Sequence, residues 1–238
     1  MDEVLLEEWS EVSQAAVLRS GRFAAALSGG KTPVSFYKLL AASGRDLPWA
    51  QTHIFPVDER AVPADHPDSN FRMIHANLLR HVPIPAGNIH PVRVDLAPGA
   101  AAEDYEKALR RFFGLRGRAF PRFDLILLGL GKDGHTASLF PEAAGLEEAR
   151  RLALAVPRPA PEHDRVSLTL PTINAAKVVV FLVAGAEKAA VLKAVLEGPS
   201  GRLPAALVRP RDGRCVFIAD KAAGALLTSF PRARRPKA

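Results

Sequence analysis

Residues 124–141 read Asp-Leu-Ile-Leu-Leu-Gly-Leu-Gly-Lys-Asp-Gly-His-Thr-Ala-Ser-Leu-Phe-Pro. The run 123–128 is typical of a buried strand, and a turn punctuated by glycines follows it and carries Asp133 and His135. Open α/β sheets bind ligands at the carboxyl ends of their strands, and an imidazole can exchange protons near neutral pH. The stretch therefore predicts a functional site at the end of this strand.

Strand and helix patterns alternate along the rest of the chain. Helices are predicted at residues 4–17, from Thr32-Pro33 onward, and at 69–79, 99–116, 187–197 and 221–227. Strands are predicted at 22–27, 52–57, 123–128, 152–156, 166–170, 178–183 and 215–219. This alternation predicts an α/β fold in which a parallel-rich sheet has helices on both faces.

Length and charge restrict the class of protein. The chain has 238 residues without a low-complexity linker or internal repeat, which predicts one α/β domain over 1–228 and a basic, disordered tail over 229–238. The formal charge is +7, and removing Arg232, Arg234, Arg235 and Lys237 leaves +3. A modestly basic body favours an anionic small molecule as ligand, with no nucleic-acid partner.

Compartment is predicted from three further observations. The N-terminal segment is acidic, unlike the basic start of a secretory signal. The longest strongly apolar run, 178–186, is far shorter than the roughly 20 residues that span a bilayer. The single cysteine, Cys215, cannot form an internal disulfide and lies in an apolar segment typical of a core. We expect a cytoplasmic protein with no membrane partner.

The first candidate ligand-binding segment is Ser28, Gly29, Gly30, Lys31 and Thr32, called here the 28–32 turn. A glycine-rich strand-to-helix turn directs backbone N–H groups toward one point, as in phosphate sites. The spacing is not that of a P-loop, and a purely structural connection remains an alternative.

Asp58-Glu59-Arg60 directly follows the predicted strand 52–57. Charged residues at that position fit a site at the strand ends, and a structural ion-pair cluster is the alternative.

The turn after residue 128 matches Gly-x-Gly-x-x-Gly, but Pro141 stops any helix too early for a dinucleotide cradle. His135 could instead be a loop histidine bonded to backbone. His75, His81 and His90 are scattered without carboxylate or thiolate partners, so no metal is expected. Ser138 lacks the Gly-x-Ser-x-Gly elbow, which predicts direct attack by water rather than an acyl-enzyme.

Five motifs together resemble one family. In order they are Ser28-Gly29-Gly30 with Thr32-Pro33, Asp58-Glu59-Arg60 with Ser69-Asn70, the 129–141 segment, Arg165-Val166-Ser167-Leu168-Thr169-Leu170-Pro171, and Gly185-Ala186-Glu187-Lys188-Ala189. The chain resembles the 6-phosphogluconolactonase family, within the glucosamine-6-phosphate isomerase superfamily, from about residue 4 to 227. The resemblance implies a Rossmann-like three-layer α/β/α fold and hydrolysis of 6-phospho-D-glucono-1,5-lactone in the oxidative pentose phosphate pathway.

The same resemblance implies roles for individual residues. His135 would transfer protons, Arg60 would stabilise the oxyanion or orient the sugar, and Asp58 would hold Arg60 or His135 or bind a substrate hydroxyl. The phosphate would lie against the 28–32 turn, and the further substrate-binding residues would be Asp133, Gly134, Arg165 and Lys188. No cofactor is implied, and a monomer or small homo-oligomer is expected.

Two alternatives to the lactonase activity remain. Related deaminases share the Asp-Gly-His step but typically continue Ile-Ala-Phe-Asn-Glu, whereas this chain continues Thr136-Ala137-Ser138-Leu139-Phe140. Those deaminases also usually have Tyr where this chain has Arg60, which favours lactone hydrolysis. A non-catalytic phosphosugar-binding regulator is the other alternative, and the presence of both His135 and Arg60 disfavours it.

Overall fold

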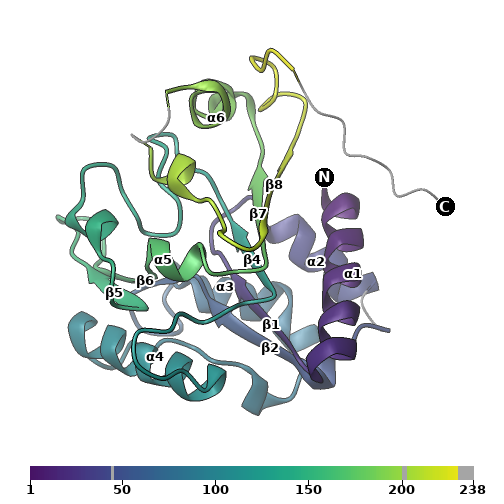
Figure 1. Cartoon of the computed structure of the whole chain (residues 1–238), viewed down its shortest axis with the longest axis vertical. Coiled ribbons are helices and arrows are strands. Elements are labelled where there is room, and N and C mark those ends of the chain that lie inside the picture. The colour runs from purple at the N-terminus through teal and green to yellow at the C-terminus, as the bar shows by residue number, and fades with distance from the viewer. Residues whose placement is uncertain (44–45, 200–202, 230–238) are drawn as a thin grey trace.

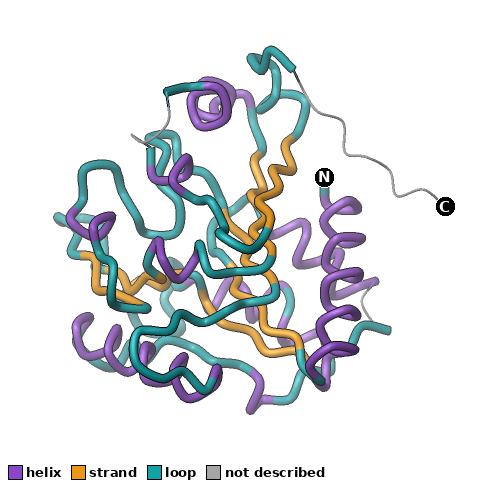
Figure 2. The backbone as a smooth tube through the Cα atoms, viewed as in Figure 1, coloured by secondary structure: helices purple, strands orange, loops and turns teal. Residues whose placement is uncertain are grey.

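The computed structural model describes residues 1–43, 46–199 and 203–229. Its main sheet has five parallel strands in the order β2-β1-β4-β7-β8 (Figure 1, Figure 2). The strands are β1 (Phe23–Leu27), β2 (Thr52–Pro56), β4 (Leu125–Leu128), β7 (Val178–Val183) and β8 (Arg214–Ala219). The predicted parallel-rich sheet is confirmed.

Helices cover both faces of this sheet, because its central strands are apolar on both sides. The helices are α1 (Asp2–Ser20), α2 (Val34–Ser43), α3 (Asn70–Asn77), α4 (Pro98–Phe113), α5 (Leu170–Ile173) and α6 (Ala189–Glu197). In Figure 1, α1 and α2 lie on one side of the sheet and α4 and α5 on the other. Within β1, Ala25 and Leu27 pack toward the first side, and Ala24 and Ala26 pack toward the second. The expected three-layer α/β/α arrangement is confirmed.

A second, smaller sheet was not predicted. It has three antiparallel strands in the order β3-β6-β5, formed by β3 (Asp58–Arg60), β6 (Arg165–Leu168) and β5 (Ala153–Val156). Val57 joins it to the main sheet: its backbone N–H donates to Leu27 O at 2.9 Å, and its carbonyl accepts from the backbone N–H of Leu168 at 2.9 Å. The residues Asp58-Glu59-Arg60, expected at the carboxyl end of the strand 52–57, therefore form a strand of their own.

Short 3-10 helices connect several elements. They are η1 (Trp49–Gln51), η2 (Leu79–His81), η3 (Ala86–Asn88), η4 (Ala144–Glu147), η5 (Ala186–Lys188) and η6 (Pro204–Leu207).

The predicted helix at 221–227 is wrong, since this segment forms turns. The Asp220 carboxylate accepts hydrogen bonds from the backbone N–H groups of Ala223 and Gly185, which favours a turn over a continued helix.

Among the described residues, no helix has both the length and the apolar character needed to cross a membrane. The predicted tail, 229–238, lies outside the described residues apart from residue 229.

Candidate active site

A cavity of about 660 Å³ lies where the segments after β1 and β4 meet the small sheet. Eleven of the twelve residues predicted for the site line it. They are Ser28, Gly29, Gly30, Lys31, Thr32, Asp58, Arg60, Asp133, His135, Arg165 and Lys188. The twelfth, Gly134, lies behind the wall: it has φ +83°, and its carbonyl accepts from the backbone N–H of Ala205.

The 28–32 turn is fixed from beneath by two hydroxyl groups. Ser28 Oγ donates to Leu127 O at 2.8 Å, and the buried Tyr37 hydroxyl donates to Ser28 O at 2.7 Å. A glycine is required at Gly29, because a Cβ there would lie 1.8 Å from Oδ1 of Asn70. Gly30 has φ +89°, a backbone conformation that favours glycine. The turn therefore presents its backbone to the cavity and admits Asn70 at close range.

The three charged residues of β3 have three different environments. Glu59 is buried and accepts hydrogen bonds from the backbone N–H groups of Asn70 and Phe71, both at 2.7 Å. It thereby binds the N-terminus of α3, where negative charge is favourable. Burial raises the pKa of Glu59, and the backbone hydrogen bonds it accepts oppose that rise. Glu59 positions Asn70, whereas Asp58 and Arg60 reach the cavity.

Asp58 lies at the base of the cavity and is buried. We expected it to hold Arg60 or His135, or to bind a substrate hydroxyl. Its carboxylate accepts hydrogen bonds from Ser138 Oγ at 2.6 Å and from Asn70 Nδ2 at 3.4 Å. Ser138 is therefore the donor in a buried Ser–Asp pair, and it does not line the cavity.

Arg60 and Arg165 are cross-strand partners in the small sheet. Arg60 donates from Nη1 to the backbone carbonyl of Asp68 at 2.6 Å, and Arg165 Nη2 lies 3.6 Å from Glu162 Oε2. The Nε atoms of both arginines are buried and have no hydrogen-bond partner among the residues that the structure describes. Burial, and then the charge of Arg60, lowers the pKa of Arg165. Both side chains line the cavity, and two guanidinium groups at one wall are suited to an anionic ligand.

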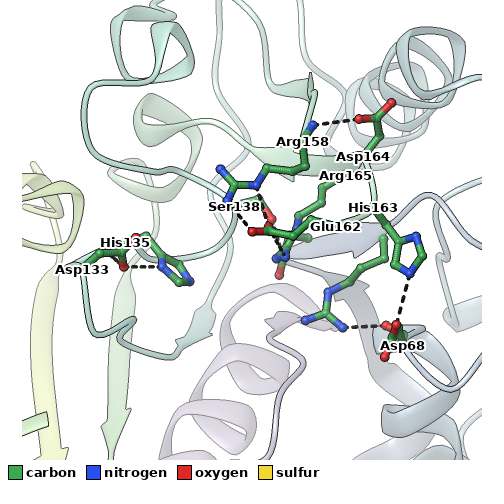
Figure 3. Close-up of polar contacts among 11 residues, drawn as sticks. Asp68, Asp133, His135, Ser138, Arg158, Glu162, His163, Asp164 and Arg165 are labelled. Carbon is green, nitrogen blue, oxygen red and sulfur yellow. Dashed lines mark hydrogen bonds and ion pairs between the residues drawn. The ribbon is translucent and has the colours of Figure 1, made fainter. Parts of the chain in front are cut away.

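The turn after β4 holds His135 by its side chain and by its backbone. Nδ1 of His135 lies 2.5 Å from Asp133 Oδ1, and the backbone N–H of His135 donates to the same oxygen at 3.1 Å (Figure 3). The ring packs 4.6 Å from that of Phe140. A carboxylate can only accept, so Nδ1 carries a proton, and Nε2 offers a lone pair in the neutral form of the ring. This geometry is that of a general base oriented by a carboxylate.

Asp133, a residue expected to bind substrate, is the hydrogen-bond partner of His135, and this contact changes the pKa of its carboxylate. Burial disfavours its ionised form, but the hydrogen bonds and charge of His135 outweigh this and lower the pKa of Asp133. Asp133 therefore lines the cavity as the partner of His135.

The segment 157–164 between β5 and β6 adds residues that the sequence did not reveal. Arg158 and Glu162 line the cavity and form a two-point ion pair, with Nε to Oε2 at 2.8 Å and Nη2 to Oε1 at 3.0 Å. The Arg158 guanidinium lies 3.9 Å from the centre of the Phe140 ring, on which it stacks. Figure 3 shows the Arg158–Glu162 pair together with the Asp133–His135 pair. The motif Arg165–Pro171 pointed to a neighbouring strand, but nothing in the sequence marked Arg158.

Lys188 reaches the cavity from η5 and donates from Nζ to Leu130 O at 2.7 Å. Burial lowers its pKa. Among the residues that the structure describes, six basic and three acidic side chains line the cavity, so its net charge is positive. The basic residues are Lys31, Arg60, Lys132, Arg158, Arg165 and Lys188.

Fold and site together define an α/β protein with a positively charged cavity at the carboxyl ends of its parallel strands, where such sheets bind ligands. The sequence profile of the family described as glucosamine-6-phosphate isomerases/6-phosphogluconolactonase matches residues 1–217. The chain belongs to this family, and the resemblance drawn from its motifs is confirmed.

Individual relatives agree with this membership. A 6-phosphogluconolactonase of Synechocystis sp. is 43% identical over 212 residues, which cover 88% of this chain and 86% of that protein. The human 6-phosphogluconolactonase is 41% identical, with 87% of this chain and 81% of that protein covered. The solved 6-phosphogluconolactonase of Thermotoga maritima superposes with a TM-score of 0.80 and 32% identity over 92% of this chain and 95% of that one.

A monomeric glucosamine-6-phosphate deaminase also shares the fold, with a TM-score of 0.76 over 95% of this chain and 97% of that one. Its identity to this chain is 19%. The fold alone therefore does not choose between the activities of the family, and the site residues must do so.

Proposed function

We propose that this chain is a 6-phosphogluconolactonase, which hydrolyses 6-phospho-D-glucono-1,5-lactone to 6-phospho-D-gluconate in the oxidative pentose phosphate pathway. The observation that carries the proposal is the His135–Asp133 pair at the wall of a positively charged cavity. Relatives named 6-phosphogluconolactonase at 41–43% identity support it.

Hydrolysis of a lactone requires a base for water, stabilisation of an oxyanion and a proton for the leaving ring oxygen. Nε2 of His135 takes a proton from water as the water oxygen bonds to C1. The C1–ring oxygen bond then breaks, and the imidazolium returns the proton to that oxygen. Asp133 holds the ring in the required tautomer and stabilises the imidazolium.

Different residues bind the phosphate and the lactone end of the substrate. The phosphate lies against the 28–32 turn, whose backbone faces the cavity, with Arg165 and Lys188 as further cations. Arg60 stabilises the oxyanion or orients the sugar. Asp58 orders Ser138 and Asn70 beneath the substrate.

Deamination of glucosamine 6-phosphate is the second candidate, since a deaminase shares the fold. The residues after His135 disfavour it: Thr136 donates to Gly129 O at 2.9 Å, and Ser138 donates to Asp58. Leu139 and Phe140 are apolar and buried, so this segment supplies no acidic group for ring opening or isomerisation.

We also propose a cytoplasmic location, on the basis of a single cysteine that cannot form an internal disulfide. Burial raises the pKa of the Cys215 thiol to about 12, which favours an inert core thiol.

Lactone loss catalysed by the purified chain, measured above the spontaneous rate, tests the proposal. His135→Gln should lower kcat/KM by about a hundredfold or more. His75→Gln, an exposed position on α3 outside the cavity, is the matched control. Full activity in His135→Gln would contradict the mechanism. Ammonia release from glucosamine 6-phosphate would establish the second candidate, and tight phosphosugar binding without turnover would indicate the non-catalytic regulator.

A further inference from the structure

Outside the catalytic cavity, three side chains that can ligate a metal ion converge. His66 and Asp68 lie between β3 and α3, and His163 lies between β5 and β6. One ring nitrogen of His163 is 3.1 Å from Asp68 Oδ2 (Figure 3). Nδ1 of His66 is 3.9 Å from the same oxygen. One ligand atom from each residue lies within 4.8 Å of the other two.

We propose that His66, Asp68 and His163 form a binding site for Zn²⁺ or a similar divalent transition-metal ion. Two imidazoles and one carboxylate suit such ions, whereas Mg²⁺ and Ca²⁺ prefer all-oxygen sites. Zinc bonds to nitrogen and oxygen are about 2.0–2.2 Å long, which places neighbouring ligands of a tetrahedral ion about 3.3 Å apart. The separations of 3.1 and 3.9 Å are close to this value, so small side-chain movements would complete the site.

Binding an ion requires two changes in the hydrogen bonds of the cluster. His66 Nδ1 accepts from the backbone N–H of Asp68 at 3.1 Å, so that nitrogen is unprotonated, and its lone pair would turn from this N–H to the ion. His163 Nε2 donates to the Asp68 carboxylate, and a metal ion would take the place of this proton. Between 36% and 57% of each side chain is exposed, so an ion can enter and keep water as its fourth ligand.

The two chain segments that would share the ion both border the catalytic cavity. The backbone carbonyl of Asp68 holds Arg60, and Arg158 and Glu162 belong to the same segment as His163. His163 and Asp68 are 95 residues apart in the chain, so the ion would cross-link two distant segments. It would therefore stabilise the folded chain, whether or not the proposed lactonase activity holds.

Calorimetric titration of the metal-free full chain with ZnCl₂ tests the site directly. We expect one ion per chain, and affinity lower by about 10–100-fold or more in His163→Gln and in Asp68→Asn. His75→Gln is the control, since His75 is an exposed histidine outside the cluster. MgCl₂ should give no comparable binding. Equal zinc affinity in the wild type and His163→Gln, or no binding by the wild type, would overturn the proposal.

The shift in unfolding temperature on adding zinc, measured for each variant against its own metal-free form, separates zinc binding from any effect of the substitution on folding. Zinc should raise the unfolding temperature of the wild type and of His75→Gln but not that of His163→Gln. The competing location is the His53–His90 pair, whose ring nitrogens lie 3.2 Å apart. Zinc binding that survives in His163→Gln and disappears in His90→Gln would place the ion there and refute the proposed site.

Discussion

Arg60 and Arg165 occupy opposite positions on adjacent antiparallel strands, and the Nε of each is buried without a hydrogen-bond partner in the described part of the chain. Neighbouring like charges with unused donors are unfavourable unless an anion lies between them or against them. The two arginines are therefore suited to bind a negatively charged group. Substitution of either one should weaken substrate binding.

Arg165→Lys should raise KM for the phosphosugar by about tenfold or more, with a smaller effect on kcat. Lysine keeps the charge but loses the planar set of donors that binds an anion through two hydrogen bonds. Steady-state kinetics of lactone hydrolysis will measure the two constants. Arg116→Lys, at an exposed position outside the cavity, is the control. An unchanged KM in Arg165→Lys would remove this residue from the binding site.

Asp133→Asn should lower kcat by about a hundredfold or more while the chain remains folded. The hydrogen bond from His135 Nδ1–H to an asparagine oxygen is weaker than the one to a carboxylate. An asparagine can also favour the wrong histidine tautomer. The single-turnover rate of lactone hydrolysis will report the loss, and Asp65→Asn, an exposed position outside the cavity, should leave it unchanged. If Asp133 only contacts substrate, KM will rise and kcat will not fall.

Gly29→Ala should destabilise the fold by about 1–3 kcal/mol and reduce activity. The new methyl group would lie 1.8 Å from Asn70 Oδ1, so Asn70 must move and lose its hydrogen bonds to Asp58. Urea unfolding will give the change in free energy. Gly99→Ala is the control: it lies at the start of α4, where the added Cβ would meet no packing neighbour among the described residues, and the change should be neutral or stabilising.

The free energy of unfolding should fall as the pH decreases from about 6.5 toward 4. Burial, and then repulsion from His53, lowers the pKa of His90 from 6.5 to about 4. The unfolded chain therefore binds more protons in this window, so stability is full above 6.5 and is lost as the pH falls. Partial solvent exposure reduces the expected effect to roughly 2 kcal/mol.

Urea titrations at several pH values will measure that slope in the wild type and in His90→Gln. The variant should show a shallower slope, although it also loses the stacking of His90 on Phe55, whose ring centres are 4.2 Å apart. The comparison therefore uses slopes rather than absolute stabilities. Identical slopes would show that His90 does not cause the pH dependence.

Local patterns in the sequence predicted the main sheet and most of its helices. The continuous apolar runs of β4 and β7 predicted buried strands, and the turns after β1 and β4 followed from their glycines. The small sheet was missed, because β3 has only three residues, all of them charged, and pairs with a strand about a hundred residues away. Such a pairing depends on tertiary structure and leaves no periodic signal.

In the candidate site, too, local motifs were predictable from the sequence, whereas contacts between distant segments were not. Each predicted residue belongs to a local motif, and all but Gly134 line one cavity. The partners of Asp58 were not predictable, since Ser138 lies 80 residues away and the hydrogen bond depends on how the two sheets meet. Arg158 was missed for a similar reason: its role depends on stacking against Phe140, which no spacing in the sequence indicates.

Val57 joins the two sheets through backbone hydrogen bonds to Leu27 and Leu168. The main sheet carries the His135 turn, and the small sheet carries Arg60 and Arg165. These groups cannot move apart as rigid bodies without breaking hydrogen bonds at Val57. We therefore expect entry of substrate and exit of product to involve the loops at the cavity mouth, with the spacing between His135 and the two arginines constant through the catalytic cycle.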